Sequence, residues 1–146
     1  MRGDTVGGPI RWKLHISAPP SKVFEALNSD EGRAAFWAES AREFDGVIHF
    51  EFINGMSYRS RILERKADSV FVIDYFGGVA RFQLAPDGKR GTDVTLTHTD
   101  VPSEDWNEVH AGWLNVLFPL KAWICFRVDL RNHDRGRLWD DGFVDQ

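Results

Sequence analysis

The sequence predicts one α+β domain in which a curved antiparallel sheet is wrapped around a long C-terminal helix. Three observations predict this fold class. An alternating strand pattern near the N-terminus is followed by two short helical segments. Several strand-like runs separated by turn residues come next, and the last long run repeats apolar side chains at three- and four-residue spacings. The chain has 146 residues, a usual length for one domain.

The N-terminal part is expected to provide the first strand. Residues 1–9 contain three glycines and a proline and little to bury, so we expect a flexible lead. From residue 10 to residue 17 apolar and polar side chains alternate, which is typical of a strand with one buried face. The side chains expected to point inward are Ile10, Trp12, Leu14 and Ile16.

Two short helices are expected between this strand and the rest of the sheet. Pro19 ends the strand, and Pro20 suits the first turn of a helix that covers residues 21–27. The polar residues 28–30 can cap a second helix, which we expect over residues 31–38. The chain therefore leaves the first strand through two consecutive helices.

A meander of antiparallel strands is expected next, because turns with glycine separate short runs of alternating apolar and polar residues. One face of this sheet should be apolar and the other should face water. The expected strands are residues 47–53, 57–65, 69–76, 79–85 and 92–100.

The last large element is expected to be a helix from Ser103 to about Val128, and Pro119 should kink it. Its second half is apolar on several sides, so we expect this half either to be wrapped on several sides or to lie at a subunit contact. Residues 130–146 are charged, and we expect them to form an extension that packs on the domain or on a partner. The apolar stripe expected to face the sheet is Trp106, Val109, Trp113, Leu117, Leu120 and Ile124.

Composition and motifs exclude several classes of function. The chain has 18 basic and 22 acidic residues and a net charge of −4, so binding of nucleic acid is not expected. The five histidines are scattered, and no phosphate-binding glycine loop precedes a helix, so neither a metal nor another cofactor is expected. The single cysteine, Cys125, and the lack of a signal-peptide or membrane-spanning apolar run predict a cytoplasmic protein.

Several segments carry a resemblance to a known family. They are IRWKLHISAPPSKVFEAL, the Phe36-Trp37 pair, GTDVTLTHTDVP and the Gly112-Trp113 pair. Together they resemble the START-like (SRPBCC) superfamily, which has the helix-grip fold, and in particular the branch of activator of heat-shock protein 90 ATPase homologues. The resemblance covers the domain at residues 10–129. It implies a cavity between the long helix and the concave sheet, entered near the short helices and the strand-connecting loops.

Strand parity and the helix stripe suggest which side chains would line this cavity. The same side chains would be placed inward if they only filled the core, so both interpretations stay open. Among the polar candidates, His98 shares its strand face with Val94 and Leu96, while His110 lies on the long helix. The candidate ligand-binding residues are Phe50, Phe52, Tyr58, Phe82, Leu96, His98, Trp113, Leu117 and Leu120.

The sequence supports three functional hypotheses, because the resembled superfamily includes carriers, receptors, aromatic cyclases and co-chaperone domains. The first is binding of a small hydrophobic ligand, lipid-like or aromatic, without catalysis. The second is a polyketide cyclase-like enzyme that uses His98 or Tyr58 as acid or base; no residue is assigned as catalytic. The third is a chaperone-regulating interaction module. The apolar helix and the Trp139/Phe143 tail also make a homodimer an expected assembly.

Overall fold

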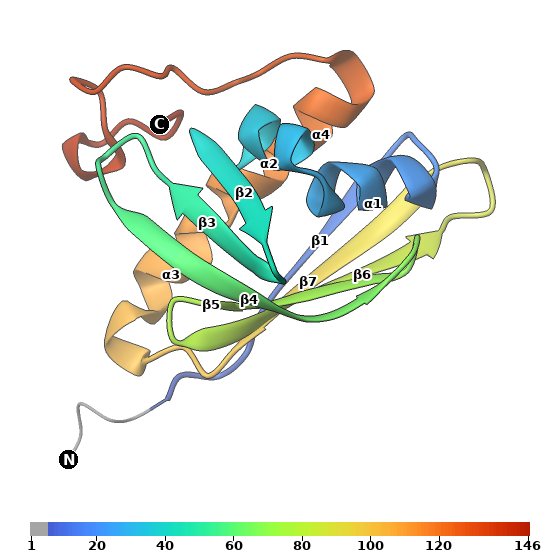
Figure 1. Ribbon diagram of the computed structural model, residues 1–146, viewed down its shortest axis with the longest axis horizontal. Coiled ribbons are helices and arrows are strands. Elements are labelled where there is room, and N and C mark those ends of the chain that lie inside the picture. The colour runs from blue at the N-terminus through green and yellow to red at the C-terminus, as the bar shows by residue number, and fades with distance from the viewer. Residues whose placement is uncertain (1–5) are drawn as a thin grey trace.

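The computed structural model describes residues 6–146, which contain a seven-stranded antiparallel sheet and four α-helices. Figure 1 shows the helices packed along the sheet. The strands lie in the order β1-β7-β6-β5-β4-β3-β2, so the first and last strands along the chain are neighbours. Their bounds are β1 Ile10–Ile16, β2 Ser40–Phe44, β3 Val47–Glu51, β4 Ser57–Lys66, β5 Val70–Tyr75, β6 Gly78–Pro86 and β7 Thr92–Thr99.

The helices follow the order that the sequence predicts. After β1 come α1 (Pro20–Asn28) and α2 (Asp30–Phe36), and after β7 come α3 (Trp106–Gly112) and α4 (Leu114–Phe126). The Ser29 hydroxyl caps α2 by accepting a hydrogen bond of 3.0 Å from the Gly32 N–H. The predicted α+β fold of the helix-grip type is therefore confirmed.

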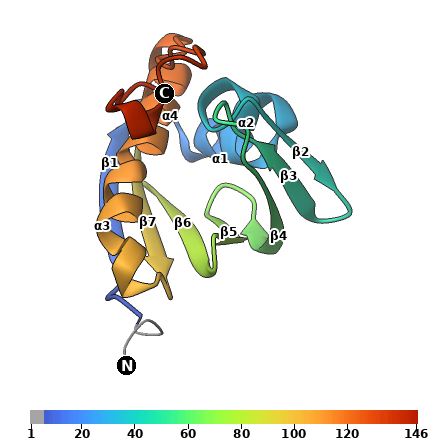
Figure 2. The same ribbon diagram turned by 90° about the vertical axis from the view of Figure 1, so that its left-hand side faces the viewer.

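The sheet contains one strand that the sequence pattern did not predict. β2 pairs with β3 at the sheet edge, with Ala41 opposite Phe50. Its sequence, SAREF, has one small buried residue among charged ones, which gives no alternating apolar signal. A register shift between Ile62 and Glu64 interrupts the pairing of β4 with β5, as a β-bulge does. In Figure 2 the β2–β3 end turns across the rest of the sheet, which makes the inner face concave.

The C-terminal helix differs from its prediction in two respects. The interruption falls at Trp113, between α3 and α4, whereas Pro119 lies inside α4. At this interruption the Trp113 carbonyl accepts hydrogen bonds from the backbone N–H groups of both Val116 and Leu117. The Trp113 indole is held in the core by its hydrogen bond to His98, which fixes the position of the interruption. The helix ends at Phe126, because Arg127 adopts a left-handed conformation with φ of 55°.

The inner face of α4 and the sheet form the core. Leu117 and Leu120 are buried with Phe71, Phe82 and Leu96. By length and composition alone the helical run Ser103–Phe126 could cross a membrane, and it is the one such run in the described part of the chain. Within this run Trp113, Leu117 and Leu120 are buried in the core.

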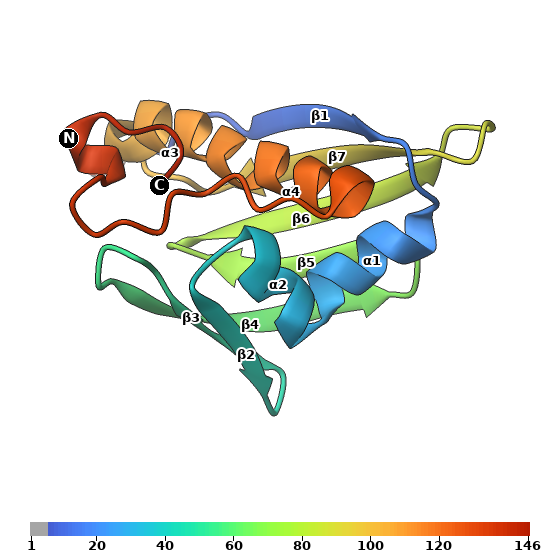
Figure 3. The same ribbon diagram turned by 90° about the horizontal axis from the view of Figure 1, so that it is seen from above.

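The described segments before β1 and after α4 both contact the rest of the domain. Residues 1–5 of the lead that was predicted to be flexible lie outside the described residues. In the described part of the lead, the Gly7 N–H donates to the Val101 carbonyl at 2.8 Å, and the Trp106 indole N–H donates to the Gly8 carbonyl at 2.7 Å. Beyond α4, the chain returns past α2 toward the α3 end of the molecule, as Figure 3 shows. The extension at residues 130–146 thus contacts its own domain.

Candidate ligand pocket

A pocket of about 440 Å³ opens between the α3–α4 junction, the turns at one end of the sheet and the C-terminal extension. This volume falls in the range of small-molecule sites. Its walls carry six aromatic side chains, which are Trp37, Phe52, Tyr75, Phe76, Trp113 and Trp139. Its polar lining consists of Asn54, His98, Glu108, Asn115, Asp140 and Gln146.

Local structure explains how the inner aromatic rings come together. Trp37 follows α2, Tyr75 ends β5 and Trp113 joins α3 to α4. The Trp37 ring centroid lies 5.6 Å from that of Tyr75 and 6.0 Å from that of Trp113. These distances are typical of packed aromatic pairs. Three separate elements therefore supply the floor of the pocket.

The β5–β6 turn places a further ring at the pocket. Its two central residues, Phe76 and Gly77, have φ of 45° and 85°, the positive values of a tight hairpin turn. A positive φ is unusual for a bulky residue and costs on the order of 1 kcal/mol. Phe76 stacks on Tyr58 with ring centroids 4.3 Å apart and lines the pocket. Strain is thus stored where this ring is presented.

His98 is buried, and both of its ring nitrogens are occupied. The Trp113 indole N–H donates to His98 Nδ1 at 2.9 Å, and His98 Nε2 lies 3.0 Å from the Tyr75 carbonyl oxygen. Because an indole only donates and a carbonyl only accepts, Nδ1 must be bare and Nε2 must carry the hydrogen. Burial lowers the pKa of His98, which agrees with a neutral ring.

The Tyr75 hydroxyl is a buried polar group of the pocket lining that has hydrogen-bonding capacity left. It accepts a hydrogen bond of 3.1 Å from the Trp37 indole N–H, and its own hydrogen meets no acceptor among residues 6–146. The side chain is 8% exposed and lines the pocket. Burial raises its pKa, so the hydroxyl stays protonated and can donate to a bound molecule.

The structure divides the residues predicted to bind ligand. Phe52, His98 and Trp113 line the pocket. Tyr58 stands behind Phe76, outside the lining, and His110 lies between the Trp12 and Trp106 rings, also outside it. The predicted residues that lie in the closed core beside the pocket are Phe50, Phe82, Leu96, Leu117 and Leu120.

Sequence reasoning missed Trp37, Tyr75 and Phe76 as lining residues. Tyr75 shares its strand face with Phe71 and Ile73, so parity places it inward. The lining contributed by Trp139, Asp140 and Gln146 had no sequence signal, because a charged extension without periodicity does not show where it docks.

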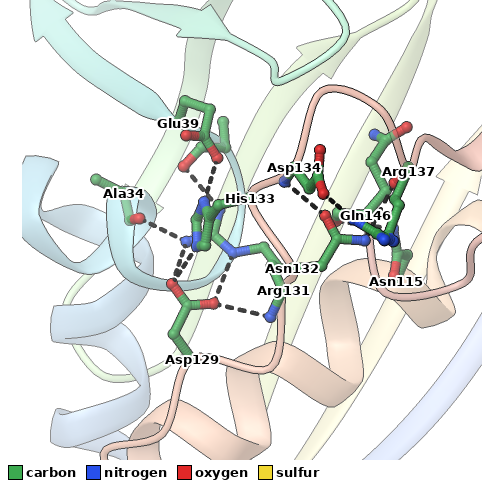
Figure 4. Close-up of polar contacts among 11 residues, drawn as sticks. Ala34, Glu39, Asn115, Asp129, Arg131, Asn132, His133, Asp134, Arg137 and Gln146 are labelled. Carbon is green, nitrogen blue, oxygen red and sulfur yellow. Dashed lines mark hydrogen bonds and ion pairs between the residues drawn. The ribbon is translucent and has the colours of Figure 1, made fainter.

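The C-terminal extension is anchored to α2 by Arg131, as Figure 4 shows. This guanidinium donates to the Ala38 and Ala34 carbonyls at 2.8 and 2.7 Å and pairs with Asp129 at 2.9 Å. Burial disfavours the Asp129 carboxylate, but hydrogen bonds from Arg131 and His133 outweigh it and lower its pKa to about 2. Arg131 is 8% exposed, so this anchor is largely protected from water.

His133 adds a second connection, between the extension and the segment after α2. Its Nδ1 lies 2.6 Å from a Glu39 oxygen and its Nε2 lies 2.7 Å from an Asp129 oxygen (Figure 4). Two carboxylates can be satisfied together only if both ring nitrogens carry hydrogen, so this geometry favours imidazolium. The hydrogen bond to Asp129 raises the pKa of His133, and the bond to Glu39 adds to the effect.

From this anchor the extension reaches the pocket. The Trp139 indole N–H donates to a Glu108 carboxylate oxygen on α3, and the Trp139 backbone N–H donates to the Gln146 side chain at 2.7 Å. The Asn115 side chain donates to the Gln146 carbonyl at 3.4 Å. The extension therefore forms one wall of the pocket. No group of three or more metal-ligating side chains occurs within residues 6–146.

Comparison with known proteins identifies relatives of this chain. A family model described as activator of Hsp90 ATPase homolog 1-like protein matches residues 17–124, which confirms the resemblance expected from the sequence. No curated protein matches the chain.

Solved structures share the fold at low sequence identity. Protein SSP2350 from Staphylococcus saprophyticus matches with a TM-score of 0.74 and 23% identity, over 84% of this chain and 96% of that one. The Aha1 dimer from Colwellia psychrerythraea matches with a TM-score of 0.74 and 20% identity, over 82% and 98%. CalU16 from Micromonospora echinospora matches with a TM-score of 0.67 and 19% identity, over 82% and 77%.

Proposed function

The chain belongs to the family of activator of Hsp90 ATPase homolog 1-like proteins, and we propose that it binds a small hydrophobic, lipid-like or aromatic molecule in the pocket beside α3. The observation that carries this proposal is the aromatic lining of a pocket of about 440 Å³ that also contains one buried, unused hydrogen-bond donor on Tyr75. Such a site offers apolar contact and one orienting polar group, which is how small-molecule sites are usually built. A cytoplasmic location is part of the same proposal.

Binding is favoured over catalysis by the state of His98. A general base needs a free lone pair, and a general acid needs a proton it can release. The Nδ1 lone pair already accepts from Trp113, and the Nε2 hydrogen faces the Tyr75 carbonyl. Tyr58, the other candidate acid or base of a cyclase-like enzyme, lies outside the pocket lining. A cyclase-like reaction would therefore need other groups.

Gly112 provides a direct test of the proposal. It lines the pocket on α3, and a β-carbon added there would meet no atom within 4 Å. Gly112→Trp therefore adds a large side chain to the pocket lining, and its β-carbon meets no neighbouring atom. We expect the uncharged fluorescent probe N-phenylnaphthylamine to bind the parent protein and to bind Gly112→Trp at least tenfold more weakly. Asn107→Leu, on the exposed side of the same helix, is the control and should bind as the parent does. Equal affinity of all three proteins would contradict the proposal.

The proposal includes a second copy of this chain as a partner. One structural relative is described as an Aha1 dimer, and α4 and the segment after it expose four large apolar side chains, which are Phe118, Phe126, Val128 and Leu130. Light scattering at micromolar concentration should give a dimer mass, and Phe126→Asp should lower it to that of the monomer. Phe44→Asp, at the end of β2, is the control, because Phe44 is also an exposed phenylalanine but lies away from α4. A monomeric parent protein would remove this part of the proposal.

Regulation of a chaperone, which the family description names, stays an alternative role for the surface. Stimulation of an Hsp90 ATPase by the purified chain would favour it. Absence of both stimulation and co-purification would remove it.

A further inference from the structure

The charges at the pocket mouth are all of one sign. Among the lining residues the ionisable carboxyl groups are Glu108 on α3 and Asp140 on the C-terminal extension, and no lysine or arginine lines the pocket. The two residues are linked through the extension, because Trp139, next to Asp140, donates its indole N–H to Glu108. One Glu108 oxygen is thereby used, while the Asp140 carboxylate has no hydrogen-bond donor within the described residues. The mouth thus offers acceptors and negative charge.

The inner end of the pocket has the opposite hydrogen-bonding character. Tyr75 is buried, with 8% of the residue exposed, and its hydroxyl already accepts from Trp37 and can still donate its own hydrogen. A neutral oxygen or nitrogen acceptor on the ligand would satisfy this donor, whereas an apolar group would leave it unpaired. His98 cannot serve instead, because both its nitrogens are occupied.

We infer that the ligand of this pocket is an organic cation, an amine whose ring system lies among the aromatic walls and carries a neutral acceptor toward Tyr75, and whose ammonium group lies at the mouth between Glu108 and Asp140. The inference rests on the proposed function and specifies its ligand class. A bound ammonium would place a positive charge between two like negative charges. A carboxylate in the same place would meet two carboxylates and no cation. Fatty acids and other acidic lipids are therefore poor ligands.

Three compounds of similar size separate charge from apolar contact. They are naphthylethylamine, naphthylethanol and naphthylacetate, which are cationic, neutral and anionic at neutral pH. By calorimetric titration we expect the amine to bind on the order of tenfold more tightly than the acetate, with the alcohol between them, since exposed ion pairs contribute modestly. The difference should shrink in high salt.

A charge-removing pair of substitutions tests the role of the two carboxylates. In Glu108→Gln/Asp140→Asn the amine should bind no more tightly than the alcohol, while the alcohol keeps its affinity, because glutamine retains an oxygen for the Trp139 indole. The control is Glu104→Gln/Asp105→Asn, an exposed acidic pair outside the pocket, which should keep the preference.

The outcomes distinguish this inference from the proposal beneath it. Binding of the alcohol with equal affinity for amine and acetate would overturn the cationic ligand class and leave ligand binding in place. The same conclusion would follow if the preference for the amine survived removal of both carboxylates. Failure of all three compounds to bind would overturn the proposed function and this inference together.

Discussion

Replacement of Arg131 by alanine should release the C-terminal extension and destabilise the domain. The guanidinium bonds two carbonyls around the end of α2 and pairs with Asp129. Hydrogen bonds to a charged group contribute about 1.5–3 kcal/mol each. The Asp129 side chain is 33% exposed, so water already weakens its ion pair with Arg131. The two backbone carbonyls can bind water once the extension is released. The energy per hydrogen bond is therefore taken at the low end, about 1.5 kcal/mol. We expect Arg131→Ala to lower the free energy of unfolding by about 3 kcal/mol.

Urea unfolding measures this loss, and hydrogen exchange of residues 130–146 measures release of the extension. Arg135→Ala is the matched control, because Arg135 is exposed and forms no ion pair within residues 6–146. It should change the free energy of unfolding by less than about 0.5 kcal/mol. If Arg131→Ala unfolds at the same urea concentration as the parent and its extension exchanges no faster, the anchoring account is refuted.

Three further predictions concern the histidines and the indole that holds one of them. Trp113→Phe should destabilise the domain by about 1–3 kcal/mol in urea unfolding, because His98 Nδ1 loses its donor in a buried site. Burial lowers the pKa of His98 below its unfolded value of about 6.5. The stability that neutral His98 contributes is therefore present above about pH 6.5 and is lost as the pH falls through the folded pKa. Thermal unfolding at decreasing pH should show this loss of stability, and His98→Gln should make the loss smaller. The pKa of His133 is raised, so the stability that its imidazolium contributes is present below about pH 6.5 and is lost as the pH rises through the folded pKa. Protection of the extension from protease should fall over this pH range in the parent protein but not in His133→Ala.

The sequence was informative where a periodic pattern met a buried face. The alternation in residues 10–17 predicted β1, and the stripe through Trp113, Leu117 and Leu120 predicted the side of the helix that packs on the sheet. The inward direction of His98 followed from its parity with Leu96, and both side chains are buried. Such patterns predict burial well, because burial repeats with the period of the element.

The pocket itself was less predictable. Periodicity shows which side chains point inward, but it does not separate those that fill the core, such as Phe82, from those that line a space, such as Tyr75. That difference depends on where β4 bends and where the C-terminal extension docks. Arg131 and His133 hold the extension through hydrogen bonds to Ala38 and Glu39, which lie nearly a hundred residues earlier in the chain. A periodic pattern in one sequence does not show contacts between residues so far apart.

The indole N–H signals of the six tryptophans test the central claim most directly, because three line the pocket and three do not. Each indole gives its own peak in a nitrogen–proton correlation spectrum, which single Trp→Phe variants assign. On titration with N-phenylnaphthylamine we expect the peaks of Trp37, Trp113 and Trp139 to shift with one saturating affinity. The peaks of Trp12, Trp106 and Trp123 should stay in place. A saturating shift confined to the second group, or no shift in any peak, would contradict a ligand site in this pocket.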